Sequence, residues 1–281
     1  ELREKTVARL EAMGIKVEYS HHEVAPSQHE IDLRYGDALA MADASMVYRW
    51  VVKEIAQEHG VYATFMPKPI FGENGSGMHV HQSLFRGESN AFFSPTDPNF
   101  LSPLAKSYTA GLLRHAREFV AVTNQWVNSY KRLVPGYEAP VYLSWARHNR
   151  STMIRVPMVK PGKEKATRIE FRVPDPACNP YLAFSVMLAA GLQGMEENLT
   201  LPPPREEDIF ELTAAERHER GIETLPGDLF GAVLEAEKSQ LVRACLGEHV
   251  FSKFIANKRI EWDRYRISVT QFEKERYLPM L

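Results

Sequence analysis

The hydrophobic positions along the chain recur with two periods, which separate expected helices from expected strands. A period of three to four residues predicts a helix over 1–13 that ends at Gly14, and a longer helix over 37–57. The same period predicts helices over 101–124 and 180–197, followed by a mostly helical tail. A chain of 281 residues is long enough to bury a substantial core between such elements.

Alternating apolar and polar positions predict short strands between these helices. Strands are expected over Ile15–Tyr19, His29–Tyr35, Tyr62–Phe65 and Met78–Leu84, with more in the loop-rich region 126–175. Helices and strands follow one another without a regular βαβ rhythm. This order favours an α+β fold over a doubly wound sheet.

Composition excludes several classes of partner rather than indicating one. The formal net charge of −2 gives no electrostatic support to a nucleic-acid or membrane-surface partner. The longest apolar run, 182–192, is shorter than the ~20 residues that cross a bilayer, so it predicts a buried helix. Cys178 and Cys245 suggest no disulfide framework, and no signal sequence opens the chain, so a reducing cytoplasm is expected.

The first polar segment that stands out is His-His-Glu-Val-Ala-Pro-Ser-Gln-His-Glu, over residues 21–30. Two strands joined by a tight, proline-containing loop would aim Glu23 and Glu30 into one pocket. Carboxylates held close together repel unless a proton or a cation lies between them. Oxygen ligands suit a hard ion such as Mg²⁺ or Mn²⁺. Exposed loop carboxylates with no ligand are the alternative.

The second segment, residues 71–81, is rich in glycine and reads Phe-Gly-Glu-Asn-Gly-Ser-Gly-Met-His-Val-His. Its three glycines let backbone N–H groups approach an anionic ligand, although no Gly-Lys-Ser/Thr follows as in a P-loop. His79 and His81 alternate along the expected strand, so they share a face. A purely structural histidine pair is the alternative.

The third segment is the expected surface flap Tyr-Lys-Arg-Leu-Val-Pro-Gly-Tyr-Glu-Ala-Pro, in which Pro-Gly and Ala-Pro bracket Glu138. A simple turn is the alternative. The fourth combines Asn-Arg-Ser at 149–151 with a strand on which Arg168, Glu170 and Arg172 alternate. Burying that face is costly without phosphate, carboxylate or metal partners, and an exposed, salt-bridged strand is the alternative.

Together, the carboxylate pair, the glycine loop and the arginine-rich strand are the parts that phosphoryl transfer from a nucleotide requires. Their motifs resemble, in order, those of the type I glutamine synthetases of bacteria and archaea, from about residue 5 to residue 281. The motifs that carry this resemblance are His-His-Glu-Val-Ala-Pro, Asn-Gly-Ser-Gly-Met-His, Arg-Leu-Val-Pro-Gly-Tyr-Glu-Ala-Pro, Asn-Arg-Ser and Asp-Pro-Ala-Cys-Asn-Pro-Tyr.

The resemblance implies an α+β catalytic domain of the glutamine synthetase and guanido kinase-like type, with a curved antiparallel sheet flanked by helices. It implies that this domain covers residues 1–281 without the family's N-terminal β-grasp domain, and that 205–281 forms its helical C-terminal part. For the full-length protein it implies a homododecamer. Phe210 stands where some members are adenylylated on a tyrosine, which favours the feedback-inhibited α subtype.

The resemblance also assigns roles to individual positions. Ligands of two Mg²⁺ (or Mn²⁺) ions would be Glu23, Glu30, His79 and Glu170. Glutamate-binding positions would be Asn74, Gly75, Arg132, Glu138 and Arg172. Positions around ATP would be Glu18, His81, Ser83, Arg150, Arg155, Lys165 and Arg168.

The implied reaction is a two-step ligation of ammonia to L-glutamate, which assimilates nitrogen. The glutamate γ-carboxylate attacks the γ-phosphorus of ATP while Arg150 and Arg155 offset charge, and ammonia then displaces phosphate after Glu138 takes its proton. A polyamine–glutamate ligase and a non-catalytic descendant are the alternatives.

The family's Glu-x-Glu metal-binding strand has no counterpart here, because Glu273-Lys274-Glu275 is expected on a solvated helix. The 281-residue chain alone is therefore expected to be largely inactive.

Overall fold

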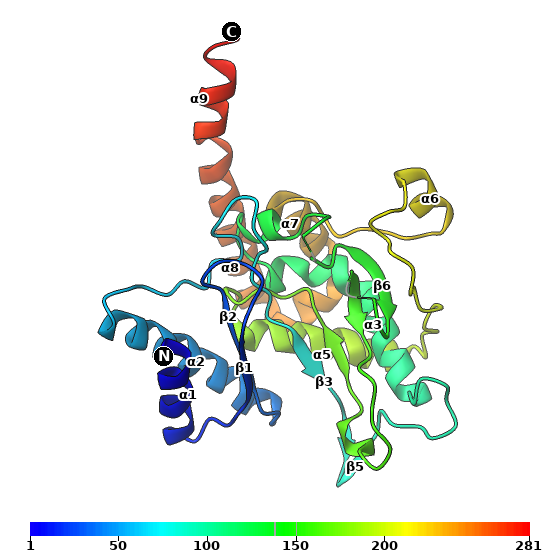
Figure 1. The fold of residues 1–281 in the computed structure, drawn as a ribbon. Coiled ribbons are helices and arrows are strands. Elements are labelled where there is room, and N and C mark those ends of the chain that lie inside the picture. The colour runs from blue at the N-terminus through cyan, green and yellow to red at the C-terminus, as the bar shows by residue number, and fades with distance from the viewer. Residues whose placement is uncertain (138, 150) are drawn as a thin grey trace.

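The structure, a computed structural model, describes residues 1–137, 139–149 and 151–281 (Figure 1). Its helices are α1 (Leu2–Ala12), α2 (Ala38–Glu58), α3 (Pro103–Thr123), α4 (Ser129–Arg132), α5 (Pro180–Glu196), α6 (Ala214–Glu219), α7 (Leu229–Lys238), α8 (Gln240–Arg266) and α9 (Gln271–Tyr277). Its strands are β1 (Val17–His22), β2 (His29–Leu33), β3 (Val80–Gln82), β4 (Phe85–Arg86), β5 (Ser89–Asn90), β6 (Tyr142–Ala146), β7 (Thr152–Arg155) and β8 (Ile169–Phe171). The expected α+β fold class is confirmed.

A four-stranded sheet in the order β3-β8-β7-β6 lies at the centre of the fold. The pairs β3–β8 and β7–β8 are antiparallel, as expected, but β6 and β7 run parallel. The alternation of apolar side chains along these strands marks a buried face and carries no information about relative direction. Two separate hairpins, β1–β2 and β4–β5, complete the sheet structure.

The first expected strand is displaced along the chain, because Ile15 belongs to the end of α1. Gly14 has a φ of 84°, and the Ile15 N–H donates to the Leu10 carbonyl at 2.9 Å. This is the hydrogen-bond pattern of a Schellman motif, which ends a helix with a left-handed glycine. The strand therefore begins only at Val17.

The strand expected over Tyr62–Phe65 is wrong, because these residues are irregular. Tyr62 is 89% exposed, so the alternation that predicted the strand does not correspond to a buried face. Phe65 packs edge-on against Tyr48 of α2, with ring centroids 5.7 Å apart. A strand needs a partner for its backbone hydrogen bonds, and the alternation of side chains does not guarantee one.

The main core forms where α3 and α5 pack against each other and against the sheet. Phe119 of α3 contacts Phe171 of β8 with ring centroids 5.7 Å apart, and both side chains are fully buried. The two helices approach closely because Gly111 of α3 faces Gly194 of α5. A Cβ atom on Gly111 would lie 2.9 Å from the Gly194 Cα, and closer still to the Ala190 carbonyl oxygen.

A second, smaller core joins α1 and α2 to the first hairpin, through the buried side chains Leu10, Val51 and Ile55. Polar contacts connect α2 to α5 and to the segment just before it: Tyr181 donates to Asp43 at 2.6 Å, and Arg49 donates to the Cys178 carbonyl at 2.8 Å. These contacts anchor α2, and the small core joins the hairpin to α2.

The tail contains the helices α6 to α9, and α9 projects from the body at the end opposite β5 (Figure 1). Glu273 and Glu275 both lie on α9, and Glu275 is exposed, as expected for a solvated helix. Within the described part of the chain, no helix is both long and apolar enough to span a membrane.

We predict that Gly111→Ala destabilises the fold. An alanine gains up to about 1 kcal/mol from helix propensity, but the new methyl group overlaps α5, which costs roughly 1–3 kcal/mol or more. The free energy of unfolding should therefore fall, as measured by urea denaturation. The matched control is Gly231→Ala in α7, where the nearest atom to the new Cβ lies 3.4 Å away. A Gly111→Ala protein as stable as the control would contradict the close helix contact.

Candidate active site

Glu170 lies at the centre of the main sheet and is only 3% exposed. It is in register with His81 on β3 and with Arg155 on β7, so three strands present these side chains on one face. The Arg155 Nε donates to the Glu170 Oε2 at 2.5 Å. The strand register therefore assembles a cluster of charged and polar groups from residues far apart in the sequence.

His79, just before β3, completes this cluster, with its Nδ1 atom 3.2 Å from the Glu170 Oε1. Burial alone would raise the pKa of Glu170, but the hydrogen bond and charge of His79 and the charge of Arg155 lower it to about 2. Burial lowers the pKa of His79. At neutral pH an ionised carboxylate therefore stands beside an imidazole that favours its neutral form, and both are types of group that can bind a divalent cation.

The arginines that alternate with Glu170 lie on the same side of the sheet. The Arg168 Nε donates to the His81 Nδ1 at 3.0 Å, and the Arg172 Nε lies 4.0 Å from the Glu170 Oε1. Burial lowers the pKa of His81 to about 4, which leaves its ring neutral and able to accept. The face thus carries three guanidinium groups beside one buried carboxylate, an arrangement suited to anionic ligands.

A second cluster forms on the hairpin β1–β2, where His21 is in register with Glu30. Ligand atoms of His21, Glu30 and Asp32 all lie within 4.8 Å of one another, and the His21 Nδ1 lies 3.4 Å from the Glu23 Oε1. Burial, a hydrogen bond with Glu23 and the charge of Asp32 raise the pKa of Glu30 to about 8. Glu30 therefore holds a proton that reduces the repulsion among these carboxylates, and a divalent cation at the same place would reduce it as well.

Sequence reasoning brought Glu23 and Glu30 together correctly but did not identify His21 or Asp32 as potential ligands. The sequence contains a signal for Asp32, because it follows Glu30 by two residues on a strand and so shares its face. The signal for His21 is its cross-strand register with Glu30, which becomes visible only once the hairpin pairing is known.

The glycine loop, residues 72–77, packs against Arg132, which is 4% exposed. The Arg132 guanidinium donates to the carbonyls of Val173 at 2.6 Å and Arg172 at 3.0 Å. A Cβ atom on Gly75 would lie 2.9 Å from the Arg132 Cγ, so only glycine fits there. Burial lowers the pKa of Arg132 to about 10, and its side chain remains charged at neutral pH.

The profile described as "Glutamine synthetase, catalytic domain" matches residues 1–277 of the chain. The chain belongs to the glutamine synthetase catalytic-domain family. It is 56% identical over 272 residues to the glutamine synthetase of Methanosarcina mazei, covering 97% of this chain and 60% of that protein. It is 55% identical over 278 residues to the enzyme of Mycolicibacterium smegmatis, covering 99% of this chain and 62% of the relative.

The chain is thus similar to glutamine synthetases over about three fifths of their length. Among solved structures, it resembles a GmaS/ADP complex with a TM-score of 0.89 and 33% identity, over 99% of this chain and 63% of that one. An apo GmaS structure matches with a TM-score of 0.85 and the same 33% identity, and the match covers 99% of this chain and 62% of the GmaS chain.

The remaining positions that the glutamine synthetase motifs suggest lie in varied surroundings. Lys165 and Glu88 form an exposed ion pair at 3.0 Å, whereas Glu18 is exposed on β1. Asn74, in the glycine loop, and Ser83, just after β3, are half-buried. Two of the suggested positions, Glu138 and Arg150, lie outside the described residues.

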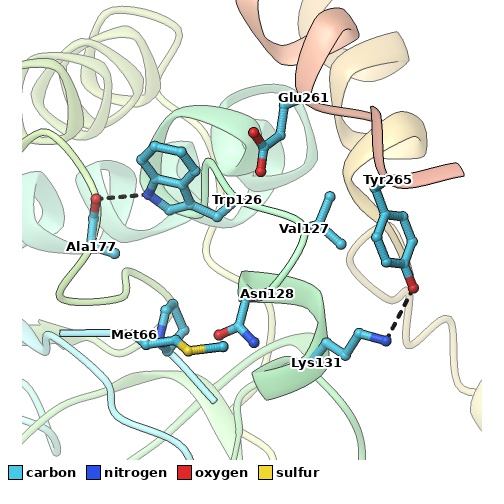
Figure 2. Close-up of a pocket in the computed structure, with 9 residues that line it drawn as sticks. Met66, Trp126, Val127, Asn128, Lys131, Ala177, Glu261 and Tyr265 are labelled. Carbon is cyan, nitrogen blue, oxygen red and sulfur yellow. Dashed lines mark hydrogen bonds between the residues drawn. The ribbon is translucent and has the colours of Figure 1, made fainter. Parts of the chain in front are cut away.

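A pocket of about 420 Å³ lies away from these clusters (Figure 2). It opens between Trp126, Lys131 and Tyr265, and none of the described glutamine synthetase site positions lines it. The Trp126 Nε1 donates to the Ala177 carbonyl at 3.0 Å, and the Lys131 Nζ contacts the Tyr265 hydroxyl at 3.1 Å (Figure 2). Because none of the described site positions lines this pocket, it is not part of the candidate active site.

We predict that Glu30 makes the stability of the metal-free protein depend on pH. Its folded-state pKa of about 8 exceeds the ordinary value of 4.5, so the folded chain binds the extra proton between these values. The stabilisation is fully present below pH ~4.5 and is lost as the pH rises through ~8. Between about pH 5 and pH 9 in EDTA, the free energy of unfolding should fall by ~4 kcal/mol more than in Glu30→Gln, because each pKa unit of the shift corresponds to about 1.4 kcal/mol.

The control for this experiment is Glu88→Gln, because the side chain of Glu88 is 96% exposed. Its pH profile should follow that of the unaltered protein. Parallel profiles for the unaltered protein and Glu30→Gln would show that Glu30 titrates normally, and would contradict the prediction.

Proposed function

We propose that the protein containing this chain joins ammonia to L-glutamate with ATP as co-substrate, through γ-glutamyl phosphate. The observation that carries this proposal is the cluster of His79, Arg155 and Glu170. In this cluster, side chains that can bind a metal ion lie beside guanidinium groups that can bind anions. Family membership supports the same reaction, because relatives 50–56% identical are named glutamine synthetase. A structural relative described as an ADP complex supports a nucleotide site.

Two groups of side chains fit divalent cations. His79 and Glu170 would hold the ion among the ATP phosphates, and Glu23 and Glu30 would hold the ion nearer to glutamate. The raised pKa of Glu30 supports this fit, because a cation can replace the proton that the clustered carboxylates retain. When bound, Mg²⁺ or Mn²⁺ would neutralise phosphate charge and orient the reacting oxygens.

The chain's own side chains would then organise the two steps of the reaction. Arg155, with Arg150, would offset charge on the transferring phosphoryl group, and His81 and Arg168 would line the nucleotide side with Glu18, Ser83 and Lys165. Asn74, Gly75, Arg132 and Arg172 would bind glutamate. Glu138 would take a proton from ammonium, so that ammonia can displace phosphate.

We further propose that the full-length protein is a cytoplasmic homododecamer of the feedback-inhibited α subtype. Phe210 supports the subtype, because it has no hydroxyl to modify and packs against Tyr142 with ring centroids 5.6 Å apart. The names of the relatives favour ammonia over a polyamine as the nitrogen donor, and favour an enzyme over a non-catalytic descendant.

The test of this function is substrate-dependent ADP release by the intact protein. ADP should form rapidly only when glutamate, ammonia and a divalent cation are all present, and glutamine should accumulate in equal amount. Polyamines in place of ammonia should give little product. ADP release that does not require glutamate, or that is faster with a polyamine, would overturn the proposal.

We predict that Glu170→Gln in the intact protein lowers kcat/KM by roughly 100-fold or more, because it removes the charge that pairs with His79 and Arg155. The KM for the ATP–metal complex should rise as well. A matched control is Glu237→Gln, which removes a carboxylate paired with Arg259 at 2.5 Å on the surface. The control should stay within about twofold of the unaltered enzyme, and equal losses in both variants would contradict the role of Glu170.

A further inference from the structure

The side chain of Gln28 connects the hairpin that carries the carboxylate cluster to the glycine loop. Its Nε2 atom donates to the Gly75 carbonyl and to the Ser76 Oγ, both at 3.1 Å. Its Oε1 atom accepts from the Ala25 N–H, also at 3.1 Å. One side-chain amide therefore joins segments that are 47 residues apart in the sequence.

The orientation of this amide is fixed by its neighbours. The Ala25 N–H can only donate and the Gly75 carbonyl can only accept, so the oxygen of Gln28 must face the first and its nitrogen the second. The backbone of Gln28 adds two bonds within the hairpin, donating to the Ala25 carbonyl at 3.1 Å and accepting from the Glu23 N–H at 2.8 Å. Gln28 thus shapes the loop beside Glu23 as well as reaching out of it.

The glycine loop also contacts Pro67 and Arg132. The Ser76 N–H donates to the Pro67 carbonyl at 2.8 Å, and a Cβ atom on Gly75 would lie 2.5 Å from that same oxygen. The buried Arg132 packs against Gly75 as well. Pro67, Arg132 and Gln28 therefore all contact the loop at Gly75 or Ser76 and together hold it in position.

We propose that Gln28 is a positioning residue that sets the distance between the carboxylate hairpin and the glycine loop, and thereby the binding of glutamate. The inference rests on the proposed function, in which Asn74 and Gly75 bind glutamate and Glu23 and Glu30 hold the nearby cation. Gln28 touches neither the substrate nor the cation in this role. It acts through the backbone of Gly75 and the side chain of Ser76.

The test uses Gln28→Met in the intact protein, which keeps the length of the side chain and removes its hydrogen bonds. The KM for glutamate should rise about tenfold, the effect of losing roughly 1.4 kcal/mol of hydrogen bonding, while the KM for ATP stays within about twofold. Hydrogen exchange of the backbone amides in 72–77 should become faster. Gln28→Glu keeps the acceptor for Ala25 but sets a carboxylate against the Gly75 carbonyl, so it should raise the KM for glutamate at least as much.

The matched control is Gln193→Met, which removes an amide that bonds to Glu197 at 2.7 Å on α5. It should change neither the KM for glutamate nor exchange in the glycine loop. An unchanged KM for glutamate in Gln28→Met, or an equal loss in every kinetic constant, would overturn the positioning role.

Hydrogen exchange separates a failure of this inference from a failure of the proposed function. Unaltered exchange over 72–77 in Gln28→Met would reject the link between the two segments, whatever the enzyme's activity. If exchange over 72–77 is faster in Gln28→Met but the unaltered protein forms no glutamine, the link between the two segments is supported and the proposed function is rejected.

Discussion

A carboxylate buried in the middle of a sheet is the constraint on which the rest of this site depends. An unpaired charge at the position of Glu170 would be very costly, so His79 and Arg155 are needed as partners. Because these partners come from the segment just before β3 and from β7, the charge of Glu170 is paired only when β8 lies in one register between them. A slip of β8 by one residue would turn Glu170 toward α3 and expose Phe171, which now packs on Phe119. Core packing and site assembly therefore specify the same register.

The two clusters of potential ligands shift the pKa of their central carboxyl group in opposite directions. The partners of Glu170 are cationic or donate to it, and its pKa falls to about 2. The partners of Glu30 are carboxylates, and its pKa rises to about 8. Glu170 is therefore ionised throughout the physiological range, whereas Glu30 would have to release a proton before it could bind a cation. Cation affinity at the hairpin should consequently depend on pH more strongly than affinity at Glu170.

The helices could be predicted from the sequence because their signals are local. The buried face of α3 recurs every three to four residues, and the left-handed Gly14 ends α1 where the pattern stops. Features that depend on pairing between distant segments could not be predicted. The parallel direction of β6 and β7, the irregular backbone at Tyr62 and the proximity of His21 to Glu30 all depend on which segment lies alongside.

The same difference between local signals and long-range pairing applies to the candidate site. Residue types and spacing drew attention to the segments that carry Glu23, Glu30, His79 and Glu170, but they did not show the contacts that join the first pair to the second. The hairpin belongs to the small core of α1 and α2, and the sheet belongs to the large core of α3 and α5. Directional polar contacts connect the two parts, from Gln28, Arg49 and Tyr181. Each such bond contributes only ~1 kcal/mol, so a small displacement of the hairpin costs far less than a rearrangement of either core. The relative position of the two halves of the candidate site therefore depends on a few directional bonds, among them those that Gln28 makes.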